Sequence, residues 1–229
     1  MSVATAEIAP ANDVHAKARF NMVESQIRTN KVTEPALLAA MSRLPRQIFV
    51  PASLAGVAYV DKSLRIAANR YLLEPLVTAR LLQEAMVSPS DKVLVIGAGT
   101  GYSTAILADL ATTVTAVESD SALADAARSN LAALAVTNAV VHAGPLEQGH
   151  GAAGPYDVIL IDGMIAELPK HIADQLADHG RLVTVQAQEG RSGTGMLYRK
   201  LGGSVSGRVL FDAVAPFLPG FEPRSAFAL

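Results

Sequence analysis

The chain has 229 residues, half of them hydrophobic, with 19 basic and 21 acidic side chains. Because these charges nearly cancel, the composition predicts no overall field that would attract nucleic acid or an anionic membrane. The lack of cysteine excludes a disulfide framework, a thiolate nucleophile and a cysteine metal site. No stretch reaches the roughly 18 apolar residues of a membrane span, and no signal-peptide pattern opens the chain. We therefore expect a cytoplasmic protein.

The first third of the chain predicts helices rather than strands. Residues 1–15 lack periodicity and predict a flexible start. Residues 16–58 predict helices, since apolar residues share one face at Phe20, Val23 and Ile27. The stretch LPRQIFVP, which lies between two prolines, predicts a loop or a short extended piece. Residues 59–74 predict an irregular connection, and PLVTARLLQEAM then predicts a helix that begins at its proline.

Beyond residue 90, strand and helix patterns alternate. Apolar runs predict strands at 92–96, 112–117, 138–143, 156–161 and 181–186. YSTAILADL, SALADAARSNLAAL and ELPKHIADQLA predict the intervening helices, the second capped by Asp120 and the third ended by Gly180. GMLYRK and RVLFDAV predict a terminal antiparallel pair. This alternation is typical of a parallel, doubly wound α/β sheet.

No repeat or linker interrupts residues 16–229, so the sequence predicts one domain after the N-terminal start. Within this domain we expect a helical part and substrate loop at 16–74 and a sheet core at 75–229.

A glycine-rich turn joins the first strand of the core to a helix, in VLVIGAGTGYSTAILADL. Because Gly97, Gly99 and Gly101 have no side chains, they expose backbone N–H groups at a helix N-terminus, where a ligand can approach closely. The dinucleotide fingerprint G-x-G-x-x-G would place its third glycine where this chain has Tyr102. The spacing G-x-G-x-G instead favours an enzyme that uses S-adenosylmethionine (SAM). A nicotinamide-dependent oxidoreductase is the disfavoured alternative.

Glu118 strengthens the prediction of a SAM site. It ends the second strand of the core, 17 residues past Gly101, where a carboxylate can accept hydrogen bonds from ribose hydroxyls. Ligands of open α/β sheets lie at the carboxyl ends of the strands. The competing interpretation is a tight glycine turn beside a solvated strand end.

Several stretches, in order, resemble protein-L-isoaspartate O-methyltransferases: FNMVESQIRTNKVTEPALLAAMSRLPRQIFVP, AYVDKSL, VLVIGAGTGYSTAILA, GPYDVILIDG and LPKHIADQLADHGRLV. The match covers most of residues 19–186. This family uses SAM to methylate the α-carboxylate of isoaspartyl residues in damaged proteins. The resemblance implies a Rossmann-like fold of about seven strands with an N-terminal helical elaboration. It also implies a methyl acceptor that is a protein, a peptide or a small molecule.

The resemblance further implies which residues form the cofactor site. They come from the glycine-rich turn, the end of the second strand and the turn after the third: Gly97, Ala98, Gly99, Thr100, Gly101, Tyr102, Ser103, Glu118, Ser119, Gly144, Pro145 and Leu146. A substrate loop is expected at Arg70, Tyr71, Leu72 and Leu73. The histidines show no metal-ligand spacing, so we predict no metal, and the sequence carries no signal for an oligomeric state.

Two departures from the family pattern fall in the cofactor site. The family's acid two residues before the first glycine is Val95 here, and its Gly-Asp-Gly is replaced by Gly144, Pro145 and Leu146. Each lost hydrogen bond to a neutral group contributes only about 0.5–1.5 kcal/mol. We therefore expect SAM binding to survive, in a weakened form. A SAM-binding protein that has lost catalysis is the alternative.

The other two departures affect the acceptor. The family's loop G-x-G-Q-T-I-S-Q-P reads AANRYLLEP, so that its Thr becomes Tyr71 and its Ser becomes Leu73. Asp162 stands in place of a family Thr. An ionised Asp162 would repel a carboxylate acceptor but would suit a hydroxyl or amine that must lose a proton. The alternative role of Asp162 is to cap a turn. Arg65 and Arg70 either hold an anionic substrate or, as we expect, face solvent.

Overall fold

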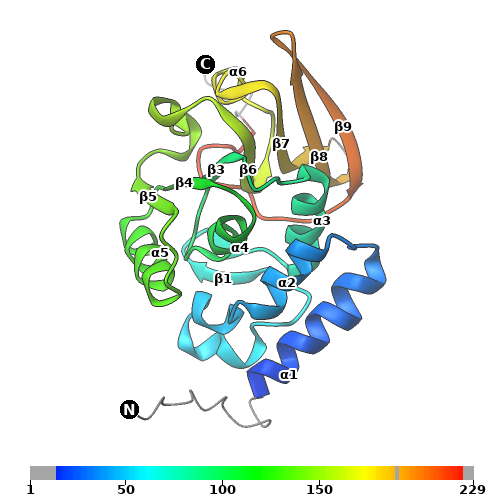
Figure 1. The fold of residues 1–229 in the computed structure, drawn as a ribbon, viewed down its shortest axis with the longest axis vertical. Coiled ribbons are helices and arrows are strands. Elements are labelled where there is room, and N and C mark those ends of the chain that lie inside the picture. Colours follow the sequence, from blue (N-terminus) through cyan, green and yellow to red (C-terminus); the bar gives the residue numbers. More distant parts are fainter. Residues whose placement is uncertain (1–13, 189–190, 224–229) are drawn as a thin grey trace, which may run out of the picture.

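The computed structural model describes residues 14–188 and 191–223 (Figure 1). Within these ranges, seven strands form the main sheet in the order β5-β4-β3-β6-β7-β8-β9. Its parallel part comprises β3 (Lys92–Ile96), β4 (Thr113–Glu118), β5 (Ala139–Ala143), β6 (Tyr156–Ile165) and β7 (Leu176–Gln188). β8 (Arg191–Leu201) and β9 (Ser204–Asp212) continue it antiparallel, as the predicted terminal pair. The doubly wound sheet is thus confirmed.

Alternate residues of β3 enter two hydrophobic clusters on opposite faces of the sheet. Val93 and Val95 face the cluster beneath α3 (Pro75–Ala85) and α4 (Tyr102–Leu110), whereas Leu94 and Ile96 face the other. α5 (Ser121–Ala133) packs against β5, and its first turn is capped by Asp120. The second cluster is covered by α6 (Lys170–Ala173) and by residues 217–221. Because both faces of the sheet are covered, the sequences of its parallel strands are nearly continuous runs of apolar residues.

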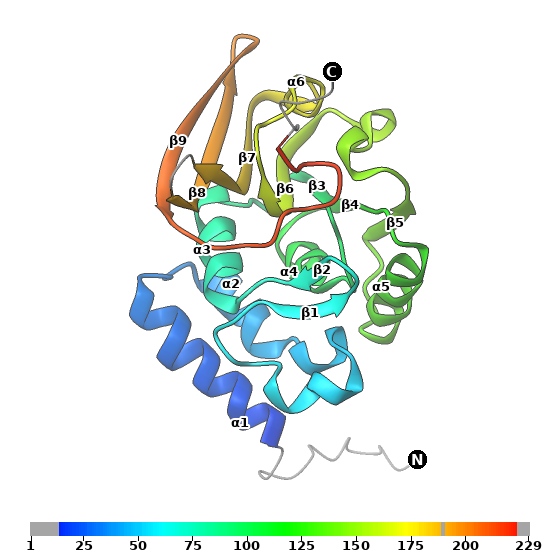
Figure 2. The same cartoon turned by 180° about the vertical axis from the view of Figure 1, so that it is seen from behind.

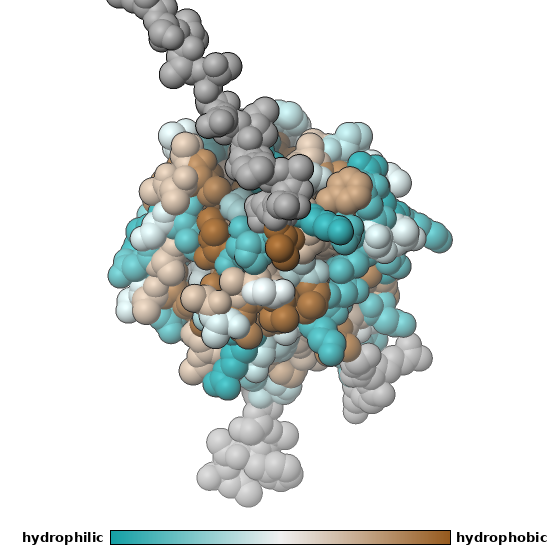
Figure 3. Space-filling view, turned by 90° about the horizontal axis from the view of Figure 1, so that it is seen from below, coloured by the Kyte–Doolittle hydropathy of each residue, from teal (hydrophilic) through white to brown (hydrophobic). Residues whose placement is uncertain are grey.

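The N-terminal part forms a layer of helices at one end of the molecule. α1 (Val14–Asn21) passes into a π-helical turn (Met22–Ile27) and a 3₁₀ turn (Arg28–Asn30), and α2 (Pro35–Arg43) follows. Figure 3 looks at this end and shows hydrophobic and hydrophilic residues interspersed over it. Phe20, predicted to share one helical face with Val23 and Ile27, is 64% exposed, whereas those two residues are buried. The π-helical turn changes the residue spacing directly after Phe20, which accounts for the wrong prediction.

The chain between α2 and α3 is more ordered than its sequence predicted. LPRQIFVP forms a 3₁₀ helix at Arg46–Phe49 rather than an extended piece, and a second 3₁₀ helix covers Ala52–Val57. The expected irregular connection contains an antiparallel hairpin of β1 (Leu64–Ala67) and β2 (Arg70–Leu72). Asn69, in the left-handed region at φ 53°, lets the chain reverse. Figure 2 shows the hairpin between the N-terminal helices and the sheet.

The helix predicted before β7 is largely wrong. α6 is only four residues long, and β7 already begins at Leu176. Gly180 lies inside β7, where an added Cβ would come within 2.8 Å of the Ala177 carbonyl oxygen. Close backbone approach, and not a helix end, therefore explains this glycine. Residues 1–13 of the predicted flexible start lie outside the described residues. Its last two residues belong to α1, which begins at Val14.

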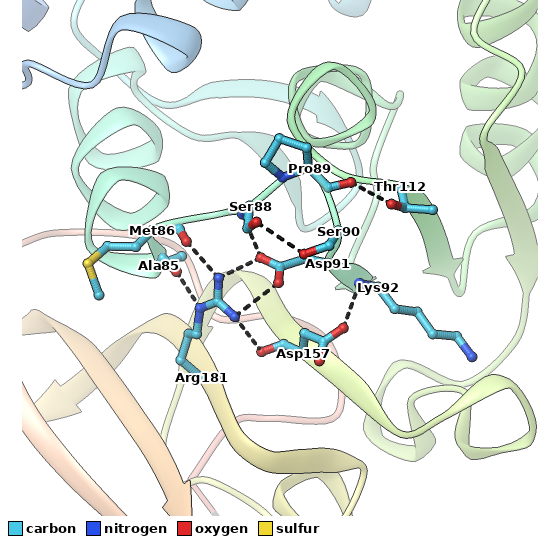
Figure 4. A network of polar contacts seen from close by, with 10 residues as sticks. All are labelled: Ala85, Met86, Ser88, Pro89, Ser90, Asp91, Lys92, Thr112, Asp157 and Arg181. Atoms are coloured by element: carbon cyan, nitrogen blue, oxygen red, sulfur yellow. Dashed lines mark hydrogen bonds and ion pairs between the residues drawn. The ribbon is translucent and has the colours of Figure 1, made fainter.

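Arg181 ties the amino end of the sheet to α3 (Figure 4). Its guanidinium donates to the carbonyl oxygens of Ala85 and Met86, each at 2.6 Å, and pairs with Asp91 at 2.5 Å. Asp157 extends the network by accepting from the Lys92 backbone N–H at 2.8 Å. A polar network therefore fixes the end of the sheet opposite to the glycine-rich turn. None of the helices in the described ranges is long and apolar enough to cross a membrane.

Candidate cofactor and acceptor site

The glycine-rich turn lies at the carboxyl ends of β3 and β4. Gly97, Gly99 and Gly101 have φ angles of 86°, 54° and 99°, in the left-handed region that favours glycine. The backbone N–H groups of Gly97 and Ala98 donate to the Val117 carbonyl oxygen at 2.9 and 3.0 Å. The turn is thus held against the next strand, with its bared backbone directed to the edge where ligands of such sheets bind.

Glu118 is completely buried beside this turn. Its Oε2 accepts from the Gly99 backbone N–H at 2.7 Å. Its Oε1 accepts from the backbone N–H groups of Ser119 and Asp120 at 2.9 and 3.1 Å. The interpretation of Glu118 as a solvated strand end is therefore wrong. The carboxylate is held beside the glycine-rich turn by these bonds, and its role toward a cofactor stays a prediction.

Arg70 occupies the remaining side of this carboxylate. Its Nη2 lies 2.5 Å from Glu118 Oε2, and the residue is only 3% exposed. The expectation that Arg70 faces solvent is wrong, whereas Arg65 is indeed exposed. Arg70 comes from β2, so the predicted substrate loop is part of the hairpin and reaches the predicted cofactor site. No sequence pattern predicts this pairing, because the two residues lie 48 positions apart.

Asp162 lies in an irregular part of β6, between Leu160 and Met164, where the register with β7 shifts. It is 9% exposed. Burial raises its pKa, while nearby Ser103, Arg70 and Arg46 act in the opposite direction. Asp162 also lines a narrow cavity of about 10 Å³ together with Tyr71, Leu73 and Leu218. The structure therefore brings together the substrate loop and the predicted catalytic residue.

Two predicted cofactor residues, Thr100 and Tyr102, contact the N-terminal layer instead. The Thr100 hydroxyl donates to the Phe49 carbonyl oxygen at 2.5 Å. The Tyr102 ring packs edge-on against Phe49, and the Arg46 guanidinium lies 4.7 Å from the ring's centre. Ser103 is buried and lies near Asp162, whose pKa it lowers. The contacts with the N-terminal layer explain the burial of Thr100 and Tyr102, and the roles of all three residues toward a cofactor stay predictions.

The turn after β5 lies beside Glu118. The Gly144 backbone N–H donates to the Glu118 carbonyl oxygen at 3.0 Å, and an added Cβ at Gly144 would meet no atom within 4 Å. Pro145 precedes a 3₁₀ turn (Leu146–Gln148), and Leu146 is buried in the second hydrophobic cluster. Gly144 thus lies beside Glu118, while Leu146 packs in the core, and the roles of Gly144, Pro145 and Leu146 toward a cofactor stay predictions. No group of three or more potential metal ligands occurs among the residues described.

The face of the glycine-rich turn is filled by other parts of the chain. A Cβ on Gly97 would lie 2.9 Å from Leu218 Cδ2, and one on Gly99 would lie 2.9 Å from Ile66 Cδ1. Leu218 is 2% exposed. The turn and the buried carboxylate are the backbone and acid that the SAM-site prediction names. The side chains of Leu218 and Ile66 fill the space next to the turn that a nucleoside would need. Sequence reasoning missed Ile66 and Leu218, because neither belongs to a motif.

Taken together, the sheet order, the glycine-rich turn and the acid at the end of β4 define a Rossmann-like methyltransferase. Two solved protein-L-isoaspartate O-methyltransferase structures share this fold. One covers 90% of this chain and 66% of its own, with a TM-score of 0.76 and 22% identity. The other, a putative enzyme from Plasmodium falciparum in complex with S-adenosyl-L-homocysteine, covers 88% and 96%, with a TM-score of 0.74 and 18% identity.

The family follows from sequence. The family model for protein-L-isoaspartate(D-aspartate) O-methyltransferase matches residues 17–215. A protein-L-isoaspartate O-methyltransferase of Methanoculleus marisnigri is 40% identical over 167 residues, which cover 73% of this chain and 76% of the relative. One of Rhodopseudomonas palustris is 40% identical over 162 residues, 71% and 74% of the two chains. The chain belongs to this family and is accordingly a SAM-dependent methyltransferase.

Proposed function

We propose that this chain methylates a hydroxyl or amine group on a protein or peptide, rather than an isoaspartyl carboxylate, and that it works in the cytoplasm. The observation that carries the proposal is the cavity at the end of β6. Asp162, Tyr71 and Leu73 all line it. A hydroxyl or amine has to lose a proton on methylation, and Asp162 is a carboxylate that can accept one.

The chemistry of the cavity disfavours a carboxylate acceptor. Leu73 is buried and apolar, so it cannot donate the hydrogen bond that the family's Ser offers at this position. An ionised Asp162 would repel a carboxylate, and the Arg70 guanidinium is already paired with Glu118. By contrast, an acceptor that donates a hydrogen bond to Asp162 would be favoured in this low-dielectric site.

Isoaspartyl methylation is the second candidate. The names of the relatives at about 40% identity favour it. Arg46 and Arg70 both lie close enough to Asp162 to lower its pKa electrostatically, so positive charge is present near the cavity. A movement that releases Arg70 from Glu118 would make one guanidinium available to a carboxylate.

The test is transfer of tritium from labelled SAM to an isoaspartyl peptide. We expect turnover at saturating SAM about 10- to 150-fold below that of a relative with the intact family loop, because one lost partner for a buried charge costs about 1.5–3 kcal/mol. The matched variant Tyr71→Thr with Leu73→Ser restores the family residues and should raise this turnover. Turnover equal to that of the relative would contradict the proposal.

A further inference from the structure

Two segments far apart in the sequence cover the glycine-rich turn. One is the β1–β2 hairpin, residues 64–72, which places Ile66 against Gly99. The other is the C-terminal segment, residues 213–223, which returns from β9 across the molecule and places Leu218 against Gly97 (Figure 2). Both lie at the carboxyl ends of the strands, where the cofactor of this family is expected.

Backbone hydrogen bonds attach the C-terminal segment to the end of β6. The Met164 N–H donates to the Pro216 carbonyl oxygen, and the Leu218 N–H donates to the Met164 carbonyl oxygen, both at 2.9 Å. A third bond, from the Ala166 N–H to the Phe221 carbonyl oxygen, is 2.8 Å long. This short bridge holds Leu218 on Gly97 and Gly163, and it is a far smaller attachment than the ladder of a central strand.

Arg70 occupies the acceptor that ribose hydroxyls would need. Glu118 Oε1 already accepts two backbone N–H groups, and Oε2 accepts from Gly99 and from Arg70. A ribose hydroxyl could reach this carboxylate only where Arg70 now lies. Arg70 pairs with Glu118 through Nη2, while Arg70 Nε is buried without a hydrogen-bond partner among the described residues. A buried ion pair with an unsatisfied donor gains little net free energy, so it can be exchanged for another partner.

We propose that the hairpin and the C-terminal segment form a two-part lid over the cofactor site, with Arg70 and Leu218 as the groups that SAM must displace. The proposal rests on the SAM-dependent function of this same site. In the closed state, Leu218 and Ile66 exclude the nucleoside and Arg70 neutralises Glu118. Cofactor binding therefore requires an open state, and the apparent affinity equals the affinity of the open state multiplied by the fraction of molecules that are open.

The lid is tested by calorimetric titration of the full chain with S-adenosylhomocysteine. Arg70→Gln frees Glu118, and Leu218→Ala uncovers Gly97, so each should bind at least tenfold more tightly than the wild type. The matched controls are Arg181→Gln, which breaks a buried ion pair at the opposite end of the strands, and Leu176→Ala, which truncates another leucine of the same hydrophobic cluster. Both controls should bind like the wild type.

Hydrogen exchange on the wild type gives a second readout that needs no variant to fold. Saturating S-adenosylhomocysteine should accelerate exchange at the amides of Met164 and Leu218, since the bridge between them opens. Equal affinity of all variants, weaker binding by Arg70→Gln, or unchanged exchange at these amides would overturn the lid while leaving the methyltransferase function intact. If neither the wild type nor any variant binds S-adenosylhomocysteine, the function itself fails as well.

Discussion

Two buried carboxylates of one site differ in what surrounds them. Glu118 accepts three backbone N–H groups and pairs with Arg70, so its charge is compensated in place. Asp162 lies on the neighbouring strand β6, and burial is the main influence on its pKa. One carboxylate is thus fixed as an acceptor, while the other is prepared to take up a proton. This division is what an anchoring group and a proton acceptor require.

The raised pKa of Asp162 predicts a pH-dependent stability difference. Because the folded state binds the proton more tightly than the unfolded state, the contribution of Asp162 to stability is present below its unfolded pKa of about 3.9. It is lost as pH rises through the folded pKa. Asp162→Asn cannot ionise, so its free energy of unfolding should rise relative to the wild type over this window. Each unit of the pKa difference corresponds to about 1.4 kcal/mol.

Urea denaturation of both proteins between pH 4 and pH 8 measures this difference. Asp157→Asn, which removes a partly buried carboxylate at the opposite end of β6, serves as a comparison for the general effect of removing a carboxylate. A wild-type-to-variant difference that stays constant with pH would show that Asp162 titrates normally.

At the scale of elements, the connection between α3 and the sheet depends on Arg181. Its guanidinium satisfies the last carbonyl groups of α3 and compensates Asp91, which is buried. Arg181→Ala leaves that charge unpaired, so we expect a loss of about 3–5 kcal/mol in the free energy of unfolding. For a chain of this size, the melting temperature should fall by roughly 10 °C.

The matched control is Arg28→Ala. Arg28 pairs with Glu24 one helical turn away on an exposed surface, where such a pair contributes only about 0.3–0.5 kcal/mol. Differential scanning calorimetry should therefore separate the two variants clearly. Equal shifts in melting temperature would mean that solvent reaches the Arg181 network and screens it.

Elements fixed by local pattern were predictable, and those fixed by distant contacts were not. The glycine-rich turn and Glu118 were found because a turn with positive φ and a strand end leave marks in the sequence. The β1–β2 hairpin left none, since Arg70 is held by a residue from another strand. α6 was predicted too long because helical periodicity continued into residues that pair with β6. Leu218 had no signal, as its position depends on the return of the C-terminal segment.

At the scale of the whole molecule, the helical layer and the sheet share one core. A single hydrophobic cluster runs from Met22 in the N-terminal part to Ala215 beyond the last strand. The buried Arg46 guanidinium donates to the Ala58 carbonyl oxygen at 2.7 Å and to that of Leu73 at 2.5 Å. It thereby connects the N-terminal helices to Leu73, the residue directly after the hairpin of the lid. Phe49 completes the connection by packing on Tyr102 of α4.

This shared core predicts that the helical part and the sheet unfold together as one domain. Calorimetry of the full chain should give a single transition whose calorimetric and van't Hoff enthalpies agree. Phe49→Ala removes a fully buried ring from the junction and should cost about 3–5 kcal/mol while keeping that single transition at a lower temperature. Val57→Ala, which truncates an exposed side chain of the same layer, should leave the transition nearly unchanged. Two separate transitions, in the wild type or in Phe49→Ala, would show instead that the helical layer is an independent unit, and the lid would then be attached to a part of the chain that can unfold without the sheet.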